Sequence, residues 1–221
     1  MASKKIETLF DLLCERYEQY TTVKRTSVVP AKLRDLQQLY PDYVYKPKDN
    51  PVREPLIEHV GCLPFMAVIL YDFLDRDDID LGEAMIMLAI HDIGELKTGD
   101  TIFYAKDAEA EAQEQKEALK LLEPRYHDLY NRIENGDDPT ACFAKSVDKF
   151  APQIPDYLAP AKETLDRYKV FLDMSDPEEI IEMKLKGKGN HFTWDKQMSE
   201  LFEYSQQKTL EKLKTANQKT S

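Results

Sequence analysis

Cysteine and glycine are both scarce in this 221-residue sequence, and each scarcity excludes a class of structure. The three cysteines, Cys14, Cys62 and Cys142, are far apart and form no CxxC pair. This pattern excludes a disulfide framework and a zinc-finger module, and it is typical of reduced thiols in a cytoplasmic protein. Only seven glycines and few alternating β-branched runs are present, which argues against a strand-rich fold.

Long apolar runs are also missing. The longest uncharged run, Val60–Tyr71, has 12 residues, whereas a membrane-spanning helix needs about 20. The N-terminal stretch MASKKIETLFDLL is charged and amphipathic, without the apolar centre of a signal peptide. We therefore expect a cytoplasmic protein that has no membrane partner.

Positive charge is in the minority. Lys and Arg together number 30 and Asp and Glu 41, which gives a net charge of −11, and no basic stripe offsets it. Such a chain repels the phosphates of DNA and RNA, so we expect no nucleic-acid polymer as a partner. A small phosphorylated metabolite or nucleotide is still compatible with this charge, because a metal ion or one or two cations can bind a phosphate locally.

Helical periodicity dominates the rest of the chain. We predict an all-α protein: a single domain over residues 1–221, a helical bundle of about seven to nine helices. Asp80 and Asp138 are expected to cap helices, Pro139 to follow its cap, and Gly99 to end a helix. The expected helices are Lys5–Tyr17, Ala31–Leu39, Leu56–Leu74 with Pro64 inside it, Leu81–Leu96, Asp107–Leu122, Thr140–Phe150, Pro160–Asp173, one that begins after Ser175 or Asp176, and Trp194–Leu213.

The stretch AIHDIGELKTGD, residues 89–100, ends a helix whose earlier part is strongly apolar. On a helix, His91 and Glu95 continue the stripe that begins with Ala84 and Leu88, and Asp92 lies beside it. A buried carboxylate without a partner costs several kcal/mol, so these polar groups on a core-facing stripe need a compensating cation. A divalent metal ion meets that need. The alternative is an ordinary polar pair at a helix end.

Two further candidates lie on other expected helices. His59 is at the polar start of an apolar helix, where a capping or core role is the alternative. Asp148 lies next to the apolar stripe of Thr140–Phe150, where a surface pair with Lys145 or Lys149 is the alternative. The order H…HD…D, with each member near an apolar face, favours one shared metal site. The remaining histidines, His127 and His191, are interpreted as surface or structural residues.

This pattern resembles the HD-domain metal-dependent phosphohydrolase superfamily, and most closely its bacterial 5′-deoxynucleotidase-like branch. The resemblance covers roughly residues 56–158, and the N-terminal and C-terminal helices are expected to pack on this core. The motif is carried by Glu58-His59, His91-Asp92, Glu95 and Gly99-Asp100.

The resemblance implies that His59, His91, Asp92 and Asp148 coordinate one divalent ion. Mn²⁺, Co²⁺, Mg²⁺, Fe²⁺, Ni²⁺ or Zn²⁺ would suit imidazole and carboxylate ligands, and the sequence does not choose among them. Two neutral imidazoles and two carboxylates balance a +2 ion, so an anionic phosphate can approach. Glu95 and Asp92 are the implied catalytic residues, and a role for Glu95 in orienting a ligand histidine is the alternative.

The resemblance also implies a substrate, a nucleoside 5′-monophosphate, and a homodimer. Asp100 would contact the sugar, and Arg53 and Lys106 are candidate phosphate contacts. The chain departs from the branch where TIFYAKD follows Asp100 in place of prolines, and the Arg-Trp pair of the branch is not visible near the N-terminus. Two alternatives stay open: a hydrolase of nucleotide diphosphates or phosphodiesters, and a non-catalytic module that binds a metal ion or nucleotide.

Overall fold

The structure is a computed structural model that describes residues 4–22, 56–99 and 107–218. The described residues form helices and no strands, so the all-α prediction is confirmed. The expected helix at 31–39 lies outside the described residues. The α-helices are α1 (Lys4–Thr22), α3 (Leu56–Leu74), α4 (Leu81–Ile90), α5 (Glu95–Thr98), α6 (Ala108–Leu121), α7 (His127–Asn135), α8 (Pro139–Phe150), α9 (Gln153–Leu158), α10 (Ala161–Leu172), α11 (Pro177–Lys188) and α12 (Lys196–Gln218), and the short 3-10 helices are η2 (Pro124–Tyr126) and η3 (Gly189–Phe192).

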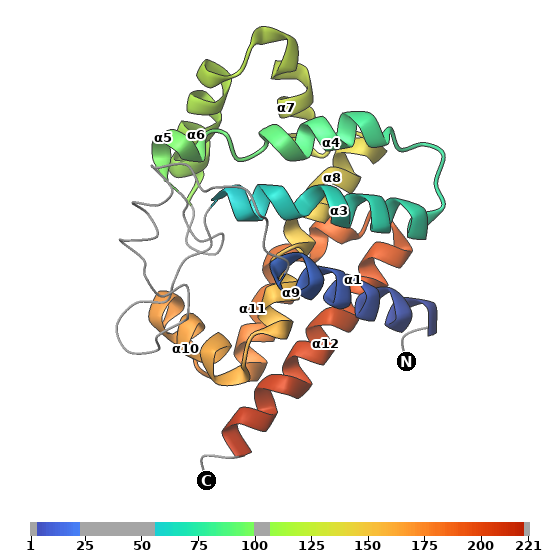
Figure 1. Cartoon of the computed structure of the whole chain (residues 1–221). Coiled ribbons are helices and arrows are strands. Elements are labelled where there is room, and N and C mark those ends of the chain that lie inside the picture. The colour runs from blue at the N-terminus through green and yellow to red at the C-terminus, as the bar shows by residue number, and fades with distance from the viewer. Residues whose placement is uncertain (1–3, 23–55, 100–106, 219–221) are drawn as a thin grey trace.

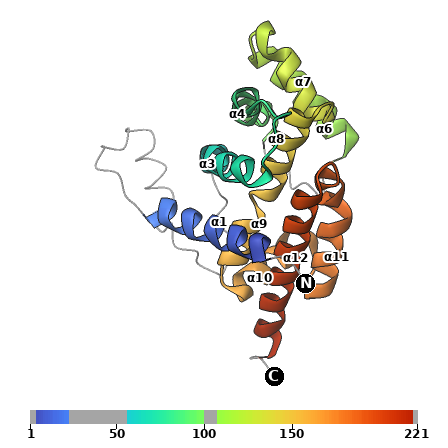
Figure 2. The same ribbon diagram turned by 90° about the vertical axis from the view of Figure 1, so that its right-hand side faces the viewer.

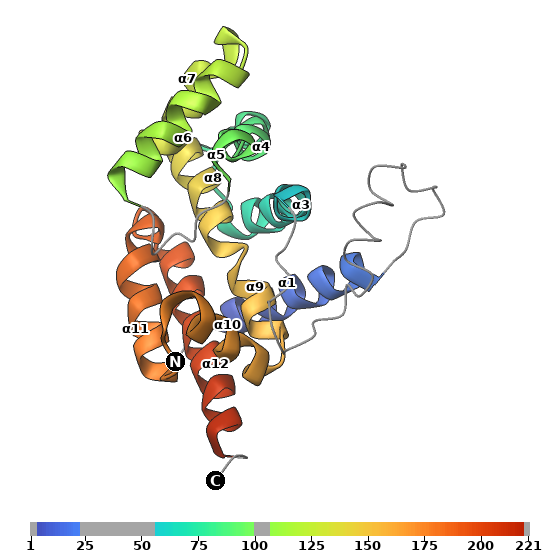
Figure 3. The same ribbon diagram turned by 90° about the vertical axis from the view of Figure 1, so that its left-hand side faces the viewer.

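Helix α8 runs through the middle of the molecule. It packs against α4, α3 and α7 on one side and against η3 on another, and Figure 1 shows α3 and α4 side by side with α8 crossing both. The long helix α12 packs against α11, α10, α9 and α1. The two turned views show α8 linking the part formed by α3, α4 and α7 to the part formed by α9–α12 (Figures 2 and 3).

Burial explains why α8 is central. Phe143, Val147 and Phe150 are fully buried, and one continuous apolar core joins them to buried side chains of α1, α3, α4 and α12. Because α8 is covered on several sides, even its polar residue Asp148 is only 4% exposed. A buried carboxylate on this helix must therefore face other polar groups.

The predicted helix ends are confirmed at several places. The side chain of Asp80 accepts a hydrogen bond from the backbone N–H of Glu83 at 2.9 Å, and that of Asp138 accepts one from Ala141 at 3.0 Å. These are N-cap interactions, and they stabilise helix starts. Gly99 ends α5 with a φ of 77°, which is the left-handed region that glycine adopts readily.

The predicted helix Leu81–Leu96 is wrong in one respect, because it breaks after Ile90. Helix α4 ends there, a turn follows over 91–94, and α5 begins at Glu95. The hydrogen bonds in the turn are of the i to i−3 type, such as Ile93 N–H to the Ile90 carbonyl at 3.1 Å. In addition, the imidazole of His91 donates to the Leu88 carbonyl at 2.9 Å, and that carbonyl would bond to the backbone of residue 92 in a continuous helix.

Candidate metal centre

Three helices bring His59, His91, Asp92 and Asp148 together. His59 comes from the first turn of α3, His91 and Asp92 follow the end of α4, and Asp148 comes from α8. The Nε2 atoms of His59 and His91 lie 3.3 Å and 3.4 Å from the same oxygen, Oδ1 of Asp148. Oδ2 of Asp92 lies 3.5 Å from Nε2 of His59 and 3.0 Å from Nε2 of His91.

The hydrogen bond of His91 determines which of its two ring nitrogens can direct a lone pair at this cluster. Nδ1 must carry a proton because its partner, the carbonyl oxygen of Leu88, can only accept. In the neutral ring Nε2 is therefore the metal-binding atom, and the backbone bond holds the ring in place. Nε2 of His91 is buried and has no hydrogen-bond partner among the described residues, although two carboxylate oxygens lie close.

The distances within the cluster fit a shared ion. Metal–ligand bonds of about 2.0–2.2 Å to imidazole and carboxylate place neighbouring ligand atoms about 3.0–3.5 Å apart. The observed distances from the two imidazoles to the two carboxylates run from 3.0 to 3.5 Å. His59, His91 and Asp148 each offer one ligand atom within 4.8 Å of the other two. The donor set and the orphaned Nε2 of His91 both suit a divalent cation.

Without a metal ion, protons take the place of the cation. Burial by itself would lower the pKa of His91, but the carboxylates of Asp148 and Asp92 outweigh it and raise this pKa to about 10. The pKa of His59 is also raised, because Asp148 and Asp92 outweigh the effect of burial. Burial would raise the pKa of Asp148, yet Lys149 and the two histidines hold it well below its usual range. The pocket thus favours positive charge at its centre.

Metal binding should therefore release protons. At pH 7 the metal-free His91 is protonated, because its pKa of about 10 lies above that pH, and the proton must leave before Nε2 can bind a metal ion. We expect the apparent affinity for Mn²⁺ to rise about tenfold per pH unit for each proton released, and to level off near pH 10. Calorimetry in buffers of different ionisation enthalpy measures the number of protons. An affinity independent of pH between 6 and 9 would contradict this arrangement.

Glu95, the predicted catalytic acid or base, is the first residue of α5 and is partly buried. Its position depends on Gly94, which lies directly against the backbone of Glu114 in α6. A Cβ atom at residue 94 would overlap the carbonyl oxygen of Glu114 and would lie 2.8 Å from its Cγ. The short turn between His91 and Glu95 can therefore pass α6 only because residue 94 has no side chain.

Replacing Gly94 by alanine should weaken both the fold and the metal site. The φ of −62° suits alanine, so the cost comes from the steric clash alone, and overpacking of this kind destabilises by about 1–3 kcal/mol. The matched control is Gly61→Ala on the exposed face of α3, where nothing lies within 4 Å of the added Cβ. We expect the control to be neutral or stabilising by about 0.5–1 kcal/mol. Denaturant unfolding and metal titration of the two variants measure the difference, and equal stabilities would contradict this packing argument.

The structure does not describe the residues predicted to bind the substrate. Asp100, Arg53 and Lys106 lie outside the described residues. His127 binds the carbonyl of Leu122 through Nε2 at 3.1 Å, near the end of α6. None of the three cysteines forms a disulfide. No helix in the described ranges combines the length and apolarity needed to cross a membrane.

Lys149 contacts Asp148, one of the predicted metal ligands. Its Nζ lies 2.7 Å from Oδ2 of Asp148, so the pair with Lys149 that was considered as an alternative does form, although Asp148 is buried. Asp148 nevertheless uses its other oxygen, Oδ1, toward both imidazoles. The neighbouring lysine is compatible with a metal-ligand role because each carboxylate oxygen has its own partner.

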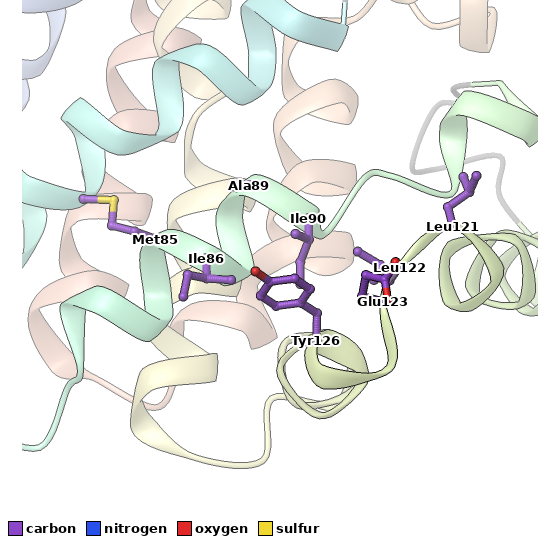
Figure 4. Close-up of a pocket in the computed structure, with 8 residues that line it drawn as sticks. All are labelled: Met85, Ile86, Ala89, Ile90, Leu121, Leu122, Glu123 and Tyr126. Atoms are coloured by element: carbon purple, nitrogen blue, oxygen red, sulfur yellow. The ribbon is translucent and has the colours of Figure 1, made fainter.

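An apolar cleft of about 490 Å³ lies on another side of α4 (Figure 4). Met85, Ile86, Ala89 and Ile90 line it from α4, and side chains at the end of α6 and in η2 line it from the other side. None of the residues predicted for the metal centre lines this cleft. The cleft is therefore separate from the polar cluster between α3, α4 and α8.

A family model and a solved structure match this chain. The crystal structure of a predicted metal-dependent phosphohydrolase from Magnetospirillum magnetotacticum MS-1 matches with a TM-score of 0.49 and 22% sequence identity, covering 72% of this chain and 81% of that chain. No match was found among the curated proteins. A family model described as HD domain matches residues 47–182, which is more than half of the chain. The chain therefore belongs to the HD-domain family.

Proposed function

We propose that the protein is a metal-dependent phosphohydrolase that removes phosphate from a small phosphomonoester, a nucleoside 5′-monophosphate. The observation that carries this proposal is that Nε2 of His59 and Nε2 of His91 each lie 3.0–3.5 Å from a carboxylate oxygen of Asp92 and from one of Asp148. Membership of the HD-domain family and the resemblance to the 5′-deoxynucleotidase-like branch support it. The homodimer and the cytoplasmic location belong to the same proposal.

His59, His91, Asp92 and Asp148 would hold one divalent ion. When bound, such an ion lowers the pKa of water and polarises a phosphoryl oxygen. The ring of His91 is held by its hydrogen bond to the Leu88 carbonyl, so its Nε2 already faces the site before the ion arrives. Lys149, which is paired with Asp148, adds positive charge beside the ligands.

Glu95 is proposed as the acid in the reaction. It follows Asp92 by three residues and begins α5 directly after the turn that contains the ligands. As the oxygen of water bonds to phosphorus and the bond from phosphorus to the 5′-oxygen breaks, Glu95 would give its proton to that leaving oxygen. The released phosphate, which carries the protons of the water, would return one to Glu95. Asp100 is proposed to contact the sugar, and Arg53 and Lys106 the phosphate.

The direct test is a phosphate-release panel. The purified protein is incubated with ribo- and deoxynucleoside monophosphates, diphosphates and cyclic dinucleotides, each with Mn²⁺, Co²⁺, Mg²⁺, Fe²⁺, Ni²⁺ or Zn²⁺. We expect release from monophosphates. Preference for a diphosphate or a diester would redirect the proposal to that substrate. Tight nucleotide binding without any product, seen as a rise in Tm, would identify a binding module instead.

A further inference from the structure

Helix α8 ends shortly after the ligand Asp148. Asp148 lies in the last turn of α8, which ends at Phe150, and Pro152 follows. In a continuous helix the N–H of residue 152 would bond to the carbonyl of Asp148, but proline has no N–H. The turn that carries a predicted metal ligand therefore lacks one of the regular bonds that fix a helical backbone.

A side chain supplies a hydrogen bond at this point. Nε2 of Gln153, the first residue of α9, donates to the backbone carbonyl of Lys149 at 3.0 Å. Lys149 directly follows Asp148, and Gln153 is only 1% exposed. Helix α9 packs against both α8 and α12. The amide of Gln153 thus joins the last turn of α8 to the neighbouring helix.

Gln153 is in turn held by Gln206 of α12. Nε2 of Gln206 donates to Oε1 of Gln153 at 3.1 Å and to Oγ of Ser205 at 3.0 Å. Gln206 and Ser205 are both buried. A path of two hydrogen bonds therefore leads from α12 through Gln153 to the residue next to Asp148.

The acceptors fix the orientation of both amides. The carbonyl of Lys149 can only accept, so Gln153 must turn its Nε2 toward it and its Oε1 toward Gln206. Ser205 requires the same orientation of Gln206, because its Oγ donates to the carbonyl of Phe202 at 2.7 Å and is left to accept from Gln206. Gln206 must therefore present Nε2, and not Oε1, to Gln153.

This arrangement leaves Oε1 of Gln206 buried, with no hydrogen-bond partner among the described residues. An unpaired amide oxygen in the interior costs stability, and an apolar side chain of the same size would avoid that cost. The stability of the core therefore does not explain why an amide stands at this position, whereas its bond to Gln153 does.

We propose that Gln206 of α12, acting through Gln153, is a positioning residue that holds the last turn of α8 and so keeps Asp148 in place at the metal centre. The inference rests on the metal centre of the proposed function and extends that centre to α12. Oδ1 of Asp148 lies 3.3 and 3.4 Å from the two imidazole nitrogens. Such sites need their groups placed within about 0.5 Å, so a looser turn weakens metal binding without removing a ligand.

The test is a calorimetric Mn²⁺ titration of Gln206→Met, which keeps the size of the side chain and removes its donated hydrogen bonds. We expect the affinity for Mn²⁺ to fall about three- to tenfold, the range for a neutral hydrogen bond. The matched control is Thr209→Val. Thr209 is equally buried on α12, but its Oγ1 donates within the helix, to the carbonyl of Ser205 at 2.8 Å. The control loses a buried hydrogen bond as well, yet should bind Mn²⁺ like the wild type.

A double-mutant cycle separates positioning from a general loss of stability. Gln153→Met should weaken Mn²⁺ binding at least as much as Gln206→Met does. Adding Gln206→Met to it should cause little further loss, because Gln206 acts through Gln153. Additive losses in the cycle, equal losses in Gln206→Met and Thr209→Val, or wild-type Mn²⁺ affinity in Gln206→Met would overturn the inference.

Hydrogen exchange of the metal-free variants gives a second readout that needs no ion. The amides of residues 147–151, at the end of α8, should exchange faster in Gln206→Met than in Thr209→Val and the wild type. Equal exchange of this segment in all three proteins would contradict the proposed path from α12 to α8.

The two proposals fail in different ways. If Mn²⁺ affinity depends on Gln206 but no phosphomonoester is hydrolysed, this inference stands and the proposed function is wrong. If nucleotides are hydrolysed and Gln206→Met leaves both Mn²⁺ affinity and kcat unchanged, the proposed function stands and this inference is wrong.

Discussion

Replacing His91 by alanine is expected to remove the bound metal ion and the release of phosphate together. The imidazole is 3% exposed, its Nδ1 is fixed by Leu88, and its Nε2 faces Asp92 and Asp148. Loss of a metal ion that supplies several kcal/mol of transition-state stabilisation corresponds to a rate loss of about a thousandfold or more.

The control for His91→Ala is His127→Ala. His127 is partly buried and, like His91, bonds to a backbone carbonyl, but it lies near the end of α6 and does not belong to the cluster. We expect this variant to keep one metal ion per chain and near-normal activity. Activity in His91→Ala within about threefold of the wild type, with metal still bound, would remove His91 from the ligand set.

Replacing Glu95 by glutamine is expected to produce the second-largest loss, and one of a different kind. The amide keeps the size of the side chain but cannot donate the carboxylic proton to the leaving oxygen. General acid catalysis contributes about 10²–10⁴-fold, so kcat should fall by that amount. The metal content should stay at the wild-type value, because Glu95 is not among the proposed ligands.

Kinetic measurement of kcat and KM with a nucleoside monophosphate separates the roles of Glu95. Glu111→Gln, an exposed position on α6, serves as the matched control and should leave both constants unchanged. A fall in metal affinity with little change in kcat for the loaded enzyme would instead assign Glu95 to orienting a ligand histidine. Such a result would contradict the catalytic role.

The sequence predicts the helices best where local signals agree. The bounds of α3 match the prediction, and Pro64 is accommodated inside the helix. The caps at Asp80 and Asp138 could be predicted because each carboxylate accepts a hydrogen bond from the backbone N–H three residues later, which is a local interaction. The helical spacing is also local, and it correctly predicts that His91, directly after α4, is buried in line with Ala84 and Leu88.

The break after Ile90 could not be read from the sequence. It depends on a bond from the His91 ring to the Leu88 carbonyl and on the contact of Gly94 with Glu114, which is 20 residues further along the chain. Periodicity alone continues the helix through this turn, because the turn keeps nearly the same spacing. The prediction of one continuous helix therefore misplaces α5, and with it Glu95, relative to α4.

The packing of η3 on α8 was also beyond the sequence. Ser146 of α8 bonds to the backbone carbonyl of His191 in η3. Residues so far apart in sequence can be brought together in many ways, and nothing local selects this one. Asp148 itself was a candidate by its order in the motif, while its burial follows from the packing of α8.

The central claim is that four side chains from α3, α8 and the end of α4 hold one divalent ion. Its most direct test is an anomalous-scattering map from crystals grown with Mn²⁺. We predict one peak per chain, bonded to Nε2 of His59, Nε2 of His91 and a carboxylate oxygen of both Asp92 and Asp148. A fully saturated crystal with no peak among these atoms, or with its peak elsewhere, would contradict it.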